Sequence, residues 1–380
     1  MRPEAAFVLA LARGEIGRAT DSAAGSLDGD LVVRLTTHHQ VDALCSWMWR
    51  KYMDSATEVH RAALSEPVVQ RLRHAYLHHL LRNESLVRDL TDLQGALAAR
   101  AIEALFLKGP WLAFHAYPDP GTRPIGDIDL AIQENDYPEA VVCLREVGYV
   151  PVAPLPQSPK EALRRSHYAE QLRFLGRGRR PVELHFRLVN VGPPSINEDW
   201  VWEGARSLKI GECTVRVPGP EAMVLHLLLH ANQHSFAVLR LLQDIRWALE
   251  KESTVDWEML RGRIRHLRCR ASAYHALLLA RDLAGADVPQ QVLDGWRPGL
   301  LRRSLFSFLW RVSAARRLEV SRRRMETESP FLFLLEMGRT KDKARYLAAL
   351  FKEAGGLGPF LKKTRRIFSR RVPGSGEGRS

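Results

Sequence analysis

The stretch Leu107–Leu130, LKGPWLAFHAYPDPGTRPIGDIDL, decides the fold and the chemistry expected of this 380-residue chain. At its end, Ile125–Ile132 alternates apolar and other residues, which is the pattern of a half-buried β-strand. Successive side chains of a strand point to opposite faces, so Asp127 and Asp129 are expected on one face. Two close carboxylates repel each other strongly when both are ionised. The pair therefore predicts a site for Mg²⁺ or Mn²⁺, which take oxygen ligands together with substrate phosphates.

The residues before this pair predict an anion site. Ile102–Leu107 is an apolar run that fits one buried strand, Lys108 and Gly109 close it, and the helix-compatible segment Pro110–Tyr117 follows. The first backbone N–H groups of a helix are free to bind anions, and proline suits that first turn. A turn-rich segment then delivers Arg123, whose fork-shaped guanidinium suits phosphate. Together these features indicate phosphoryl or nucleotidyl transfer.

The pattern of Lys-Gly, a helix, Arg-Pro and then Asp-x-Asp on a strand resembles the polymerase-beta-type nucleotidyltransferase superfamily. Within it, the chain most resembles the branch of uncharacterised nucleotidyltransferases. That branch has a later strand with Glu-Leu-His, which matches Val182–Phe186 (VELHF). The resemblance spans roughly Asp42–Pro289, and its specific motifs lie between Lys108 and His185.

The resemblance implies a reaction and a set of site residues. A nucleoside monophosphate would move from a nucleoside triphosphate, such as ATP, to a hydroxyl acceptor that the sequence does not identify. Asp127 and Asp129 would bind two Mg²⁺ ions, and Glu183 would help to hold one of them and activate the acceptor hydroxyl. The catalytic and metal-binding residues would be Asp127, Asp129 and Glu183, and the substrate-binding residues would be Lys108, Gly109, Arg123 and His185. Asp244 also recurs in that branch, without a role that spacing reveals.

The residues alone leave other interpretations open. Glu183 fits an ordinary exposed strand position, Lys108 fits a strand cap, and His185 fits a packed ring. The whole chain could then be a non-catalytic relative that binds a nucleotide or a partner protein. A third possibility is an adaptor that binds nucleic acid or a membrane surface through a basic tail.

Two further motifs have a plain and a functional interpretation. His226, His230 and His234 are spaced four apart, which predicts one shared helix face. Zinc needs further ligands, so the spacing favours a packed or substrate-facing helix over a zinc site. The turn Gly176–Arg180 carries three arginines beside the strand with Glu183. It is either a solvated loop or a clamp for a triphosphate or acceptor.

The predicted fold class is α+β, a small mixed-sheet nucleotidyltransferase core flanked by helical regions before and after. We expect an N-terminal helical region over 1–98, the core over 99–218, a helical domain over 219–295 and a basic helical C-terminal region over 296–380. Helices are expected over 68–100, 135–147, 221–230, 236–250, 257–267 and 271–284, and strands near 149 and over 168–175, 181–189 and 213–217.

The charge of the chain is concentrated at its C-terminus. From Arg297 onward there are 21 Lys/Arg and 7 Asp/Glu, whereas the remainder has 35 and 36. This end is therefore the candidate for contact with nucleic acid or another anionic surface. Phe360–Phe368 has the pattern of a basic interfacial helix or of a helix docked on the body, and 374–380 of a disordered end. Four scattered cysteines predict a reducing, cytoplasmic location, and no apolar run approaches the about 20 residues of a membrane helix.

Overall fold

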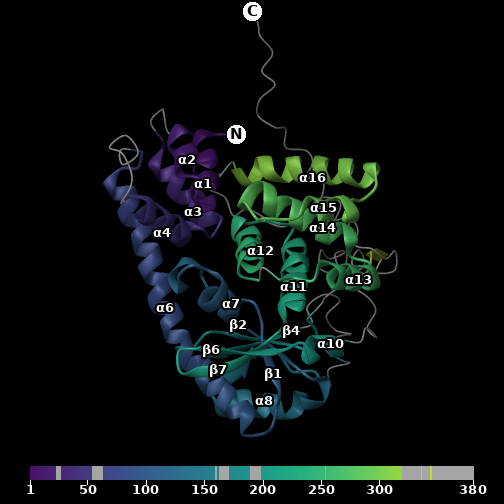
Figure 1. Cartoon of the computed structure of the whole chain (residues 1–380). Coiled ribbons are helices and arrows are strands. Elements are labelled where there is room, and N and C mark those ends of the chain that lie inside the picture. The colour runs from purple at the N-terminus through teal and green to yellow at the C-terminus, as the bar shows by residue number, and fades with distance from the viewer. Residues whose placement is uncertain are drawn as a thin grey trace, which may run out of the picture.

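The computed structural model describes residues 1–22, 27–53, 63–158, 161, 171–188, 198–252, 254–318, 335 and 343–344. Its fold is α+β, as the sequence predicts, with a five-stranded mixed sheet between helical parts (Figure 1). The helices before the sheet are α1 (Pro3–Arg13), α2 (Ile16–Ser22), α3 (Gly29–His38), α4 (Asp42–Met53) and α6 (Glu66–Ala98). The later helices are α8 (Tyr137–Glu146), α10 (Asp199–Glu203), α11 (Pro220–Gln233), α12 (Leu239–Lys251), α13 (Trp257–Leu267), α14 (Arg270–Leu279), α15 (Gln290–Trp296) and α16 (Leu300–Leu318).

The large sheet has the strand order β1-β2-β5-β4-β3. Its strands are β1 (Ala104–Phe106), β2 (Ile128–Ile132), β3 (Tyr149–Pro151), β4 (Gln171–Gly176) and β5 (Val182–His185). The neighbours β2 and β5 run parallel, and the other three pairs are antiparallel. The parallel register places Asp129 directly beside Glu183. This register agrees with the shared site for Asp129 and Glu183 that the resemblance implies.

Two expectations about β2 were wrong. The strand begins at Ile128 and not at Ile125, so Asp127 lies just before it. All five of its residues are buried, where a half-buried strand was expected. Both differences follow from its central place, because β1 and β5 flank it and the residues before it are held by other groups. The side chain of Arg180 donates a hydrogen bond to the carbonyl oxygen of Ile125.

The connection from β1 to β2 contains the predicted helix in a modified form. The short helix α7 (Gly109–Trp111) continues into a π-helical turn, η1 (Leu112–Ala116), and a 3₁₀ turn, η2 (Pro120–Thr122), follows. Lys108, at the start of α7, has a φ of 29°, which is strained for a residue with a side chain. The chain thus turns sharply between β1 and α7, at the residue that the sequence assigns to phosphate.

A second, two-stranded sheet was only half predicted. β7 (Cys213–Val217) matches the expectation, whereas its antiparallel partner β6 (Arg206–Ile210) was missed. In β6, Arg206, Ser207 and Lys209 leave few apolar residues to mark an alternating pattern. The hairpin packs against α6 and against β1, which is an edge strand of the large sheet.

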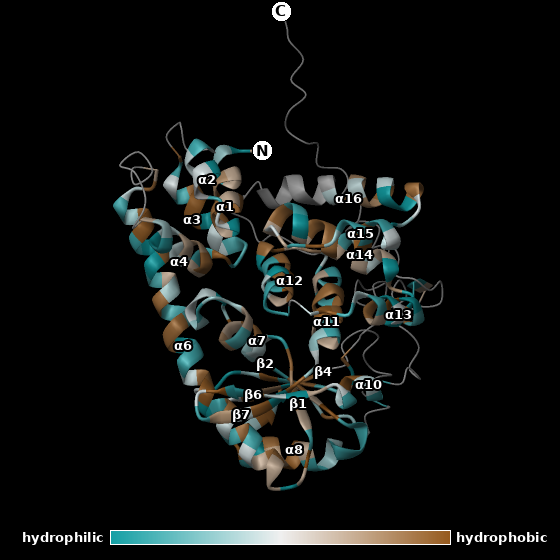
Figure 2. Cartoon of the chain, in the orientation of Figure 1, coloured by the Kyte–Doolittle hydropathy of each residue, from teal (hydrophilic) through white to brown (hydrophobic). Residues whose placement is uncertain are grey.

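Helices surround the large sheet on several sides. α6 runs from the N-terminal helices down to the sheet, where it contacts α8 and β7 (Figure 1). The sheet lies between α8 on one side and α11 and α12 on the other. Apolar residues gather on the central strands and along α11 (Figure 2). None of the helices in the described parts is long and apolar enough to cross a membrane.

The C-terminal region is described only in part. α16 includes the basic pair Arg302 and Arg303, and its Phe306 stacks on the ring of His275 at 3.7 Å between centroids. The basic clusters after Leu318 and the expected helix around Phe360–Phe368 lie outside the described residues. The four-part domain division stays a prediction.

Candidate active site

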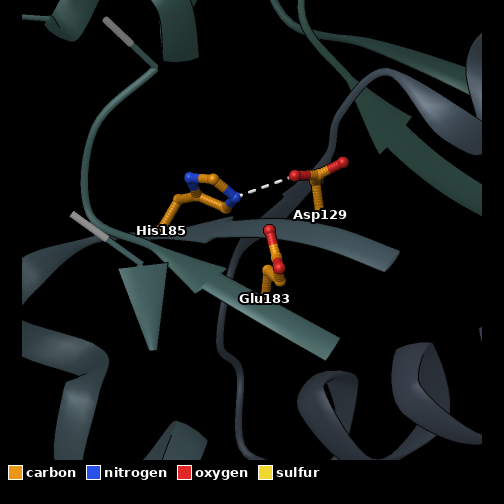
Figure 3. Close-up of side chains that lie close together, drawn as sticks. All are labelled: Asp129, Glu183 and His185. Carbon is orange, nitrogen blue, oxygen red and sulfur yellow. Dashed lines mark hydrogen bonds and ion pairs between the residues drawn. The ribbon is translucent and has the colours of Figure 1, made fainter. Parts of the chain in front are cut away.

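Three side chains converge where β2 and β5 lie side by side. Asp129 comes from β2, and Glu183 and His185 come from one face of β5. One potential ligand atom of each lies within 4.8 Å of the others, and Figure 3 shows the three side chains turned toward one another. The predicted closeness of Glu183 to Asp129 is therefore confirmed. His185, expected to contact substrate, lies within this cluster as a candidate ligand.

Asp129 is held by two cationic or donor groups. Its Oδ1 lies 2.8 Å from Lys108 Nζ and 2.9 Å from His185 Nε2. All three residues are buried, with Asp129 only 3% exposed. Burial opposes the ionised carboxylate, but Lys108 and His185 outweigh it and hold the pKa of Asp129 well below its usual range. Asp129 is therefore an anion at neutral pH.

Asp127, Asp129 and Glu183 are three carboxylates at one end of a cavity, and we call them the acidic floor. Asp127 is half-buried, immediately before β2, and lines the same cavity as Asp129 and Glu183. Burial raises the pKa of Glu183, and the charges of Asp127 and Asp129 raise it further. The repulsion among three carboxylates is what a divalent cation would relieve. A set of two carboxylates and an imidazole within 4.8 Å, with a third carboxylate beside them, fits Mg²⁺ or Mn²⁺.

Gly109 allows the turn after β1 to pack against the loop that delivers Asp127. A Cβ atom at this position would lie 3.2 Å from Ile125 Cγ2 and 3.6 Å from the carbonyl oxygen of Asp127. The first of these distances is tighter than ordinary contact, so only glycine fits without a shift. The sequence assigned Gly109 to phosphate through its amide. The structure adds a packing reason for the same residue.

Arg123 lines the cavity, but its guanidinium is turned toward Asp244. Its Nε lies 2.8 Å from Asp244 Oδ1 and its Nη2 lies 3.0 Å from Asp244 Oδ2. Tyr117 and Arg240 also donate to this carboxylate, at 2.8 and 3.0 Å. Burial opposes the charge of Asp244, but Arg123 and Arg240 lower its pKa. Asp244, which spacing could not explain, thus fixes Arg123 and joins α12 to η1.

In the arginine turn, Arg177 is exposed, whereas Arg179 and Arg180 are held by other parts of the chain. Arg180 donates from its side chain to the carbonyl oxygens of Ile125 and Arg82, and burial lowers its pKa to about 10. Arg179 pairs with Asp89, at 3.1 Å, and with another carboxylate of α6. The turn therefore ties α6 to the loop before Asp127. These contacts join segments far apart in sequence, so the spacing of the arginines could not reveal them.

A cavity of about 960 Å³ opens above the acidic floor. Its size is at the upper end of small-molecule sites. One wall is α6, and the facing wall is formed by α11 and the start of α12. All seven residues that the sequence proposed for the site line it: Lys108, Gly109, Arg123, Asp127, Asp129, Glu183 and His185.

His226 and His230 of α11, and His234 directly after its end, all line the cavity, which fits the shared face that their spacing predicts. The rings of His226 and His230 are stacked with centroids 6.0 Å apart. Burial lowers the pKa of His226 to about 3 and that of His230 well below its usual value, and the nearby Lys108 lowers both further. Within the described parts of the chain, the one group of three candidate metal ligands is Asp129, Glu183 and His185. The expectation of a packed or substrate-facing helix is thus favoured over zinc.

Comparison with known proteins gives a family and weak structural likenesses. No curated protein matches the chain. The crystal structure of ANT(2'')-Ia in complex with adenylyl-2''-tobramycin is 14% identical, covers 48% of this chain and 98% of its own, and has a TM-score of 0.36. A nucleotidyltransferase-like protein from Paracoccidioides brasiliensis is also 14% identical, covers 55% of this chain and 97% of its own, and has a TM-score of 0.32. At these scores the two likenesses support no argument about the site.

The family match is extensive. The model described as "Uncharacterised nucleotidyltransferase" matches residues 26–285, which include every residue of the acidic floor and both walls of the cavity. The matched span is more than half of the chain and agrees with the α+β architecture around β2 and β5. The chain belongs to the family of uncharacterised nucleotidyltransferases, and its enzyme class is that of the transferases of phosphorus-containing groups.

Proposed function

We propose that the protein transfers a nucleoside monophosphate from a nucleoside triphosphate to a hydroxyl acceptor, with a divalent metal ion at the acidic floor. The observation that carries this proposal is the convergence of Asp129, Glu183 and His185 within 4.8 Å, beside Asp127. A cavity of about 960 Å³ above them is large enough for small-molecule ligands. Family membership supports nucleotidyl transfer as the reaction class.

Asp127, Asp129 and Glu183 would hold Mg²⁺ or Mn²⁺, and the imidazole of His185 would serve as a further ligand or would orient Asp129. Bound there, the ion would neutralise charge on the triphosphate and lower the pKa of the acceptor hydroxyl. Lys108 would supply a point charge to the phosphates, and the Gly109 amide would donate to them. Arg123 would use guanidinium N–H groups that Asp244 and the Pro124 carbonyl leave unused.

The chemical step is a displacement at phosphorus. The acceptor oxygen bonds to the α-phosphorus, the bond from that phosphorus to the bridging oxygen breaks, and pyrophosphate leaves. The hydroxyl proton would pass to Glu183, the carboxylate to which we assign activation of the acceptor. Rate acceleration would come mostly from positioning and electrostatics.

The test uses the full chain, Mn²⁺ and each nucleoside triphosphate labelled at the α-phosphate. We expect Mn²⁺ to bind the wild type and to bind Asp129→Ala much more weakly. In cell extract, label should move to an acceptor with the wild type and not with Asp129→Ala. Asp136→Asn, a half-buried carboxylate outside the cavity, is the matched control and should behave like the wild type. Nucleotide binding without any transfer would instead support the non-catalytic relative.

The same experiment identifies the nucleoside triphosphate that the enzyme uses, and ATP is the first candidate. We also propose a cytoplasmic location. All four cysteines are buried and unpaired, which fits a reducing compartment.

A further inference from the structure

One wall of the cavity carries basic side chains that make no hydrogen bond or ion pair within the described structure, although the ring of His78 lies edge-on to that of His79. His74, His78 and Arg82 lie at positions i, i+4 and i+8 of α6, so they share one face of the helix. All three are exposed and line the cavity. We call them the α6 basic stripe. It spans about 12 Å along the helix axis, and Arg82 forms the end that lies near Ile125.

The other cations of the cavity are already engaged. Lys108 pairs with Asp129 at 2.8 Å, and Arg123 and Arg240 both pair with Asp244. Arg180 donates to two backbone carbonyl oxygens. The α6 basic stripe differs from these groups, because no hydrogen bond or ion pair of its side chains occurs among the described residues. Its imidazole and guanidinium donors are therefore available to a ligand.

The base of the stripe is fixed relative to the acidic floor. Arg180 donates to the carbonyl oxygen of Arg82 at 2.9 Å and to that of Ile125, two residues before Asp127. The side chain of Arg82 thus starts near the loop that delivers Asp127. A ligand that binds the α6 basic stripe with one group can therefore reach the acidic floor with its other end.

The carboxylates of the cavity are restricted to its floor and to one other position. Asp127, Asp129 and Glu183 form the floor, and Asp42 lies 3.9 Å from His79. The lining residues of α6, α11 and α12 include no acidic side chain. An acceptor with several positive charges is held by carboxylates. The lining residues of α6, α11 and α12 offer hydrogen-bond donors and no carboxylates. The triphosphate is assigned to Arg123 and to Lys108 and Gly109 at the start of α7, which leaves the stripe for a second ligand.

We propose that the α6 basic stripe binds a phosphate or carboxylate group of the acceptor, which is therefore an anionic hydroxyl compound and not a polyamine. This inference rests on the proposed function and specifies its second substrate. Hydrogen bonds from guanidinium and imidazole to anionic oxygens are the contacts expected, with Arg82 as the strongest donor.

The first test measures binding of inorganic phosphate to the full chain saturated with Mn²⁺ and a non-hydrolysable ATP analogue. Phosphate should bind the wild-type complex, and Arg82→Gln should weaken it by about tenfold or more, as for loss of a charged hydrogen bond. Arg73→Gln is the matched control, because Arg73 is exposed on the same helix but does not line the cavity. It should leave the phosphate affinity unchanged. The double variant His74→Asn and His78→Asn should weaken phosphate binding less than Arg82→Gln.

Three results of this test would overturn the inference. Phosphate that binds only without the analogue, or an analogue affinity that falls with Arg82→Gln, would assign the stripe to the triphosphate. Equal loss in Arg73→Gln would show a general effect of charge. A wild type that binds no analogue with Mn²⁺ would instead reject the proposed function itself, which keeps the two failures distinct.

The second test identifies the charge class of the acceptor directly. Small-molecule extract is separated on anion and cation exchangers, and each fraction is incubated with the full chain and triphosphate labelled at the α-phosphate. Labelled product from the fraction retained by the anion exchanger supports the inference. Product only from the cation-exchanger fraction, only from uncharged compounds, or only in precipitated macromolecules contradicts it.

Discussion

Asp129 is the residue on which the site depends most, because it is both a candidate metal ligand and the partner of a buried cation. Its Oδ1 atom lies 2.8 Å from Lys108 Nζ and 2.9 Å from His185 Nε2. Asp127, by contrast, is half-buried and precedes the strand. The sequence treats the two aspartates as an equal pair. The structure separates their roles in stability while leaving both beside the candidate metal position.

We expect Asp129→Asn to destabilise the metal-free protein, whereas Asp127→Asn should leave its stability nearly unchanged. Removing the charge of Asp129 leaves the buried Lys108 ammonium without its anionic partner, which costs on the order of 3 kcal/mol. Urea unfolding of the two variants, without metal, measures the difference. Both should lose Mn²⁺-dependent transfer. Asp129→Asn with wild-type stability would mean that Lys108 finds another partner or water.

At the level of elements, the predicted parts are those with a strong local pattern. α13 and β7 match their expected ranges fully, and α6, α8, α11 and α12 differ by a few residues at their ends. Periodicity and turn residues set these elements through short-range rules. The seven proposed site residues line one cavity because their motifs fall on the adjacent strands β2 and β5 and on the turn after β1.

What the sequence could not provide are contacts between distant segments. The Arg123 and Asp244 pair joins residues 121 positions apart, and Arg180 reaches Arg82 across 98 positions. Such pairs depend on how helices pack, which no local spacing encodes. The start of β2 at Ile128 has the same origin, since Arg180 binds the carbonyl oxygen of Ile125.

The buried group around Asp244 gives a pH-dependent prediction. The pKa of Asp244 is lower in the folded chain than in the unfolded one, mainly because Arg123 and Arg240 overcome the effect of burial. Its contribution to stability is therefore complete above the unfolded value, near pH 4, and is lost as pH falls through the folded value. Asp244→Asn should destabilise the protein by about 3 kcal/mol or more at pH 7. The difference from the wild type should shrink below about pH 4.

Denaturant unfolding of both proteins across pH 3–8 checks this expectation. Glu250→Gln on the same helix is the control, because that carboxylate is exposed and its pair with Arg246 spans 3.7 Å at the surface. It should change stability by less than about 1 kcal/mol at every pH. A deficit of Asp244→Asn that stays constant down to pH 3 would show that hydrogen bonding, and not charge, gives this carboxylate its effect.

For the whole molecule, the catalytic body and the basic C-terminal end differ in charge. Before Arg297 the chain is nearly neutral, and after Gly355 it has seven Lys/Arg and one Asp/Glu. Every residue that we assign to the metal, the triphosphate or the acceptor lies before residue 241. Charge of one sign in a short segment attracts anionic polymers and lipids. We therefore treat the segment after Gly355 as an accessory to the enzyme.

Removal of residues 356–380 should leave the affinity for Mn²⁺ and the ATP analogue unchanged and weaken binding to RNA or anionic vesicles. For RNA, each lost contact lowers the slope of log affinity against log salt by about 0.7. A full-length variant with Lys362, Lys363, Arg365, Arg366, Arg370 and Arg371 replaced by Gln separates charge from packing. If charge acts alone, it should match the truncation. The truncation could lower the melting temperature while the Gln variant does not. In that case the apolar residues Phe360 and Ile367 pack on the body, and the accessory assignment is wrong.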